Sequence, residues 1–127
     1  MVKNKNDPCI FCVFDRPVLA ENDLARAFLD SYPISKGHAL IAPKRHVRTM
    51  FDTDADEYQA CFKLVREVRE LLLAEHQPDG LNIGINCDAA GGQSVWHAHI
   101  HVIPRYAGDV DDPLGGVRNV IPVKDKT

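Results

Sequence analysis

Three histidines near the end of the chain alternate with apolar residues. His97, His99 and His101 lie within the run 95–103, whose period-two alternation predicts a β-strand with all three imidazoles on one face. Packing alone explains such a cluster poorly, because side chains two apart on a strand lie only ~7 Å apart and would repel if all were protonated. The cluster therefore favours neutral imidazoles, which act as nucleophiles, bases or metal ligands.

A small-residue loop precedes these histidines. Gly91, Gly92, Gln93 and Ser94 supply flexible backbone, amide donors and a hydroxyl directly before the predicted strand. Backbone N–H groups in such a turn form a concave anion site. A Gly-Gly pair by itself is more often only a turn, but its place beside three histidines indicates a phosphate site.

The remaining candidate chemistry is in the cysteines. Cys9 and Cys12 form a C-x-x-C pair, whereas Cys61 and Cys87 are isolated and are expected to be small buried hydrophobes. The N-terminus has no apolar segment typical of a signal peptide, so we expect a cytoplasmic protein whose thiols stay reduced. A thioredoxin-like role needs a βαβ setting that this N-terminus lacks. Two readings stay open, a pair of reduced thiols or half of a zinc site.

The segment 92–105 resembles the signature of the histidine triad (HIT) family, in which three histidines alternate with apolar residues. The similarity extends to residues 9–12, 27–30 and 37–46 and covers nearly the whole chain. The tail 103–118 is similar to microbial members labelled dinucleoside polyphosphate hydrolases.

The resemblance implies a nucleotide hydrolase or nucleotidyl transferase. By position, His99 would attack the α-phosphorus of a purine nucleotide conjugate and form a covalent nucleotidyl-imidazole, from which water releases a nucleoside monophosphate. His101 and the segment Gln93–Ser94 would contact phosphate oxygens and the departing group. His38 would complete the cluster from an adjacent strand, so the implied catalytic set is His38, His97, His99 and His101.

The resemblance also implies a nucleotide pocket. Asp30 would accept hydrogen bonds from the ribose hydroxyls, and Asn86 would face the phosphate or ribose. From the residues alone, Asp30 is favoured as the cap of the turn 31–37, and Asn86 is nearly as well explained as a turn residue. The residues implied to enclose the purine, which read in isolation as core, are Ile10, Phe11, Phe14 and Phe28.

Some HIT proteins close a structural zinc site from a C-x-x-C pair and two histidines. The matching positions here are Cys9, Cys12, His46 and His97, a normal closed zinc set. No catalytic metal or organic cofactor is expected. The implied substrates are dinucleoside polyphosphates or nucleoside phosphoramidates.

Three alternatives remain. The acceptor could be phosphate in place of water, or the protein could be a purine-nucleotide-binding regulator with negligible turnover. A metallohydrolase with all three alternating histidines on one metal is disfavoured, because the three positions spread along ~13 Å of strand.

The elements that position these residues follow from pattern and turn chemistry. Strands are predicted over 23–30, 38–43, 81–86 and 95–103, and one long helix begins at 52–54 and ends before Pro78. The tail from 106 to 127 is expected to be extended and irregular. We therefore predict a single α+β domain over 1–127, a HIT-like antiparallel sheet with one long helix, and the resemblance implies a two-fold homodimer.

Composition limits the partners. The chain has 127 residues, 45% of them hydrophobic, and a net charge of −3. This balance argues against nucleic-acid binding through bulk charge, and no apolar stretch reaches the roughly 18 residues of a membrane span. A small nucleotide needs only local donors and is the expected partner.

Overall fold

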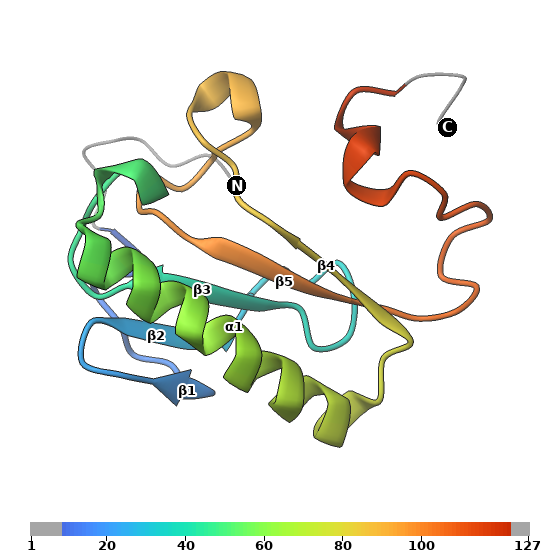
Figure 1. The fold of residues 1–127 in the computed structure, drawn as a ribbon, viewed down its shortest axis with the longest axis horizontal. Helices are drawn as coiled ribbons and strands as arrows, with labels where there is room; N and C mark the ends of the chain where they lie inside the picture. Colours follow the sequence, from blue (N-terminus) through green and yellow to red (C-terminus); the bar gives the residue numbers. More distant parts are fainter. Residues whose placement is uncertain (1–8, 123–127) are drawn as a thin grey trace.

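The computed structural model describes residues 9–122 as an antiparallel sheet with one long helix across one face (Figure 1). The five strands are ordered β1-β2-β3-β5-β4 and every neighbouring pair is antiparallel. Their bounds are β1 Ala20–Glu21, β2 Ala25–Leu29, β3 Ala39–Pro43, β4 Gly80–Gly84 and β5 Ile100–Arg105. The predicted α+β class with one long helix is confirmed.

Helix α1 spans Ala55–His76 and begins with a capping box. The Asp54 side chain accepts from the backbone N–H of Glu57, and the Glu57 carboxylate accepts from the N–H of Asp54. These bonds satisfy two donors that a helix start leaves open. The helix ends where Gln77 adopts a left-handed conformation, directly before Pro78. Both predicted ends of the helix are confirmed.

The central strand β3 is buried along its whole length. Ala39 and Ile41 pack in the cluster beneath α1, whereas Leu40 and Ala42 pack with Phe11 on the opposite face. Because strand side chains alternate between faces, this strand reads as a continuous apolar run. The N-terminal segment thus covers part of the sheet face that α1 leaves free.

The prediction of one strand over 95–103 is wrong in its first half. The backbone bends at 95–97 and β5 begins only at Ile100, so His97 and His99 precede the strand and His101 alone lies in it. The N–H of Ala98 donates to the carbonyl of Val47, outside the sheet. Alternating apolar residues cannot reveal such a bend, because a packed loop buries apolar side chains equally well.

Short elements lie beside the sheet. The 3-10 helices are η1 Met50–Asp52, η2 Ala89–Gly91 and η3 Gly116–Val120. The last of these corrects the prediction of an irregular tail in part, and residues 123–127 of that tail lie outside the described range. Within residues 9–122, no helix is both long and apolar enough to cross a membrane.

Candidate active site

A cavity of about 700 Å³ opens on the sheet face opposite α1. Leu40 of β3 and His101 and Ile103 of β5 line its floor. The residues before β2 and the turn after it form one end, and β4 with η3 forms the other. The cavity is large enough for a small-molecule ligand.

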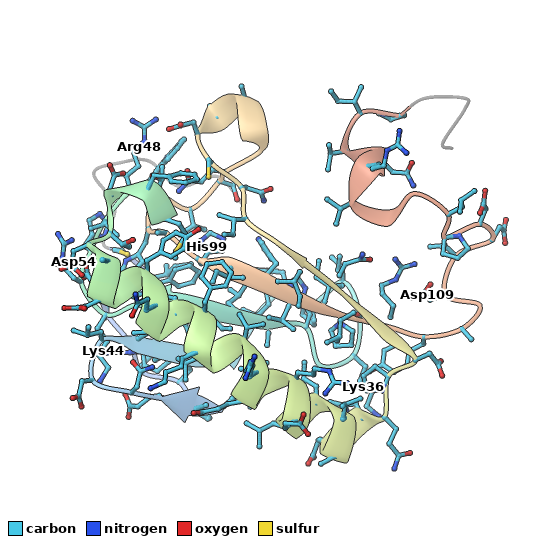
Figure 2. The ribbon with its side chains drawn as sticks, viewed as in Figure 1. Lys36, Lys44, Arg48, Asp54, His99 and Asp109 are labelled. Carbon is cyan, nitrogen blue, oxygen red and sulfur yellow. The ribbon has the colours of Figure 1, made fainter. Side chains whose placement is uncertain are left out.

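His99 lies just before β5 and lines this cavity (Figure 2). Its ring is 7% exposed, and its Nδ1 lies 2.7 Å from the backbone carbonyl of His97. A carbonyl can only accept, so Nδ1 carries the proton and Nε2 keeps its lone pair. Phe11 packs edge-on against the ring, with centroids 5.2 Å apart. The backbone therefore fixes one tautomer of His99 and leaves Nε2 as the nucleophilic nitrogen.

A second chain of hydrogen bonds orients His101. The N–H of Ile34 donates to Nδ1 of His38 at 3.2 Å, so the proton of neutral His38 is on Nε2. That nitrogen lies 3.0 Å from Nδ1 of His101 and 3.5 Å from a carboxylate oxygen of Asp30. His101 therefore accepts through Nδ1 and carries its own proton on Nε2. The arrangement makes His101 a hydrogen-bond donor.

Burial keeps these imidazoles neutral. It lowers the pKa of His99 and of His38, although the Asp30 carboxylate opposes the shift at both. For His101, burial and the neighbouring His99 and His38 lower the pKa to about 4. The lowered pKa values favour the uncharged form of all three rings at neutral pH.

The structure disfavours a catalytic metal on these histidines. Asp30, His38 and His101 bring three possible ligand atoms within 4.8 Å of one another. However, the Ile34 N–H places the proton of His38 on the nitrogen that would have to bind the metal. The hypothesis that all three alternating histidines share one metal is also contradicted, because His97 faces Cys9 and Cys12 and not the cavity.

His97 contributes to a separate cluster with two thiols. Its Nδ1 lies 3.3 Å from Sγ of Cys9, 3.4 Å from Sγ of Cys12 and 3.2 Å from Nδ1 of His46. The Cys12 thiol is 3.3 Å from His46 Nδ1, and the four ligand atoms all lie within 4.8 Å of one another. Zinc bound tetrahedrally at the usual bond lengths would separate such atoms by about 3.3–3.8 Å, with the two sulfurs farthest apart. The donor set fits zinc in both chemistry and spacing.

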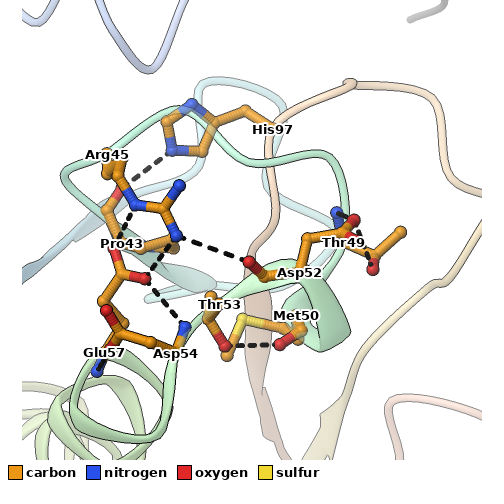
Figure 3. Close-up of polar contacts among 9 residues, drawn as sticks. All are labelled: Pro43, Arg45, Thr49, Met50, Asp52, Thr53, Asp54, Glu57 and His97. Atoms are coloured by element: carbon orange, nitrogen blue, oxygen red, sulfur yellow. Dashed lines mark hydrogen bonds and ion pairs between the residues drawn. The ribbon is translucent and has the colours of Figure 1, made fainter.

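The other ring nitrogen of His97 is held by the backbone. Nε2 lies 2.8 Å from the carbonyl of Pro43, so it carries the proton and Nδ1 keeps its lone pair (Figure 3). A backbone carbonyl on the second nitrogen is the usual partner of a metal-binding histidine. Burial and the neighbouring thiol of Cys9 raise the pKa of Cys12 to about 11, so a metal would have to displace the proton of this thiol.

The residues implied for the nucleotide pocket divide into two layers. Those that line the cavity are Ile10, Phe11, Asp30, Asn86 and Ser94. Phe28 is fully buried behind Phe11, with ring centroids 5.2 Å apart, and Phe14 packs against Phe28 at 5.0 Å. Phe14 and Phe28 therefore support the cavity wall and do not line it.

The side chain of Gln93 is not part of the cavity lining. Its side chain is 5% exposed, and Nε2 donates to the carbonyls of Arg48 and Val95 while Oε1 accepts from the N–H of Asp88. These bonds occupy the amide, so the Gln93 side chain shapes the loop and only Ser94 of this pair lines the cavity.

The sequence did not predict some of the residues that line the cavity. Arg16 lines the end near Asp30, and Val117 and Val120 of η3 line the far end. The i, i+3 spacing of the two valines is a signal that the tail forms a helical turn with an apolar side.

Comparison with known proteins identifies the fold family. The family model described as "HIT domain" matches residues 13–108. The chain belongs to the HIT domain family. An uncharacterized HIT-like protein from Mycoplasma genitalium is 38% identical over 84% of this chain and 79% of its own length. The HIT protein named adenylylsulfatase HINT3, from Arabidopsis thaliana, is 36% identical over 83% of this chain and 55% of its own length.

Solved HIT structures have the same fold. The crystal structure of a zinc-bound histidine triad family protein from Mycobacterium smegmatis superimposes with a TM-score of 0.72 and 32% identity, covering 80% of this chain and 77% of that one. Family membership supports nucleotide binding or hydrolysis in general, and the five-stranded sheet with its single helix is the HIT fold.

Proposed function

We propose that this HIT protein hydrolyses purine nucleotide conjugates through a covalent nucleotidyl-histidine at His99. One observation carries the proposal: the hydrogen bond from Nδ1–H to the His97 carbonyl leaves the neutral Nε2 of His99 free beside the cavity. A neutral imidazole with a fixed tautomer is nucleophilic at neutral pH. The name of the relative HINT3, an adenylylsulfatase, adds support for hydrolysis of a nucleotide conjugate.

In the first half-reaction, the lone pair of His99 Nε2 forms a bond to the α-phosphorus. The bond from phosphorus to the leaving group breaks, and the leaving group keeps the electron pair. The Nε2–H of His101 donates a hydrogen bond to the departing atom, and the His97 carbonyl stabilises the positive charge that develops on His99. Asp30 and Ser94 would hold the ribose and the phosphate.

In the second half-reaction, a water oxygen attacks the same phosphorus. The P–N bond breaks, its electron pair returns to His99 Nε2, and the proton of the water is released to solvent. The product is a nucleoside monophosphate. With inorganic phosphate as the acceptor, the same step would yield a nucleoside diphosphate.

Product analysis tests the proposal. Adenosine and guanosine polyphosphates and nucleoside phosphoramidates are incubated in ¹⁸O-labelled water, with and without phosphate. We expect a nucleoside monophosphate that carries the label. Nucleoside diphosphate formed only with phosphate would favour phosphorolysis, and binding of purine nucleotides without turnover of any substrate would favour a regulator.

We also propose a structural zinc ion on Cys9, Cys12, His46 and His97. The four donor atoms all lie within 4.8 Å of one another, four of their separations are 3.2–3.4 Å, and a zinc-bound family member has the same fold. Zinc there would cross-link the N-terminal segment to the segments that carry the two histidines. Metal analysis of protein purified without metal-affinity columns should find about one zinc per chain. Less than about a tenth of an equivalent in active protein would contradict the site.

The proposed assembly is a two-fold homodimer. Strand β4 is at the edge of the sheet, and its Ile83 is 39% exposed. An edge strand with apolar side chains is suited to pairing with a second copy. Light scattering should give twice the chain mass of 14.2 kDa; a monomer at all concentrations would contradict it.

A further inference from the structure

Glu57 is a buried carboxylate that the proposed reaction does not use. It lies in the first turn of α1 and is 3% exposed. Its oxygens accept from Arg45 Nε at 2.9 Å and from Arg45 Nη2 at 2.7 Å, in addition to the N–H of Asp54 (Figure 3). A capping box needs only the backbone contacts. The two-pronged bond to Arg45 therefore needs a separate explanation.

Arg45 lies in the middle of the segment that shapes the metal site. Two residues before it, the Pro43 carbonyl accepts from His97 and so fixes which nitrogen of His97 faces the thiols. One residue after it, His46 supplies a ligand nitrogen directly. The position of this short stretch of backbone thus determines two of the four proposed ligands.

His46 is exposed, and its ring meets the ring of His97 edge-on, with centroids 5.1 Å apart. The neighbouring Lys44 forms an ion pair with Glu21 at 3.2 Å, and both side chains of that pair are substantially exposed. Such pairs contribute little to geometry. The two parallel bonds between Arg45 and the buried Glu57 are directional, since the guanidinium and the carboxylate meet as planar forks.

We propose that Glu57 is a positioning residue of the metal site. Through Arg45 it fixes the segment 43–46 on the N-terminus of α1, so that His46 and His97 meet the thiols of Cys9 and Cys12 before the metal binds. The inference rests on the proposed zinc site and extends it to a residue that touches none of the four ligands. Residues outside the ligand set typically change metal affinity 10- to 100-fold.

Zinc affinity measures this role directly. Zinc-loaded protein is titrated with a chromogenic chelator, for the wild type, Glu57→Gln and the matched control Glu21→Gln, which removes the exposed ion pair of the same segment. We expect zinc affinity to fall 10- to 100-fold in Glu57→Gln and to stay within about twofold of the wild type in Glu21→Gln. Arg45→Lys keeps a positive charge but loses the fork, and it should weaken zinc binding as well.

A second readout separates positioning from general stabilisation. The rise in melting temperature on zinc loading, relative to chelator-treated protein, should be smaller in Glu57→Gln than in the wild type. Equal zinc affinity in Glu57→Gln and the wild type would overturn the positioning role and leave the zinc site intact. Failure of the wild type to bind zinc would overturn the site itself and the inference with it. If Glu57→Gln does not fold, Arg45→Lys decides by the same two measurements.

Discussion

His97 and His99 lie only two residues apart but belong to two different clusters. A hydrogen bond to a backbone carbonyl determines which nitrogen of each ring faces its cluster. His97 donates from Nε2 to the Pro43 carbonyl, which leaves Nδ1 facing the two thiols. His99 donates from Nδ1 to the His97 carbonyl, which leaves Nε2 at the cavity. In the proposed assignment, the same type of side chain serves as a ligand or as a nucleophile according to which of its nitrogens meets a carbonyl.

The clusters also differ in how they are protected. His99 lies among buried rings, whereas the cluster of cysteines and histidines proposed to bind zinc includes the exposed Cys12 and His46. A nucleophile gains from burial, which keeps it neutral, but exposed ligands need a metal or a positioned backbone to stay together. We therefore expect changes in the first cluster to affect chemistry and changes in the second to affect stability.

The largest expected effect concerns His99. His99→Asn keeps a hydrogen-bonding side chain but removes the attacking imidazole, so turnover should fall by several orders of magnitude. AMP affinity should change only a few-fold, because other residues supply the remaining contacts. Acid quench with labelled substrate should trap an acid-labile nucleotidyl-protein in the wild type and none in His99→Asn.

His76→Asn is the matched control for this experiment, because His76 lies at the end of α1 and outside the cavity lining. Its turnover should equal that of the wild type. If His99→Asn retained more than about a tenth of wild-type turnover, His99 would be excluded as the nucleophile. His101 would then be the next candidate.

Cys9→Ser tests the other side of the comparison. Removing one proposed ligand should abolish stoichiometric zinc and lower the melting temperature, since a structural site contributes folding energy. The loss of turnover in the fraction that stays folded should be much smaller than that of His99→Asn. The control is Cys87→Ser, a partly buried thiol outside the cluster. A large loss of turnover in Cys9→Ser, with one zinc still bound per chain and an unchanged melting temperature, would contradict the assignment of Cys9 to a structural metal site.

The alternation pattern predicted the three histidines but not the division between them, and only the family resemblance implied that His97 belongs with the thiols. Alternation placed all three on one strand face, and only the bend at 95–97 sends His97 to the thiols. That bend depends on contacts from far along the chain, such as the bond of Ala98 to Val47, which no local pattern contains. The ends of α1 were predictable because the cap at Asp54 and the proline after the helix are local signals.

Residue type is also a weak guide to burial and to contacts. On α1, Leu64 is fully buried, whereas the equally apolar Phe62, two residues away and therefore on another side of the helix, is 38% exposed. Gln93 illustrates it at the site, since its residue type suits a phosphate contact and its amide bonds to loop backbone.

A smaller effect is expected at Asp30. Its Oδ1 already accepts from the Tyr32 N–H, and the carboxylate also faces His38. If Asp30 also accepts from the ribose hydroxyls, Asp30→Ala should reduce the preference for ribonucleotide over deoxyribonucleotide substrates, by about 1.5–3 kcal/mol for a charged hydrogen bond. The measurement is kcat/KM for matched substrate pairs, with Asp23→Ala as an exposed control. Equal losses on both sugars would assign Asp30 to the turn alone.

The smallest effect is a pH dependence of stability that comes from Glu57. The hydrogen bonds from Arg45 are the main cause that lowers the pKa of Glu57 below its usual 4.5, and burial opposes them. A carboxyl group with a lowered pKa in the folded state stabilises it above the unfolded pKa and loses that contribution as the pH falls through the folded value. The free energy of unfolding of Glu57→Gln should therefore be below that of the wild type at pH 7, and the gap should narrow below about pH 4.5.

Denaturant unfolding with a chelator present at every pH keeps metal release out of the comparison. In Glu21→Gln, whose ion pair is exposed, the difference from the wild type should stay near zero throughout. A gap for Glu57→Gln that is constant between pH 7 and pH 3 would mean that packing, and not the charged pair, connects Glu57 to the segment of Arg45.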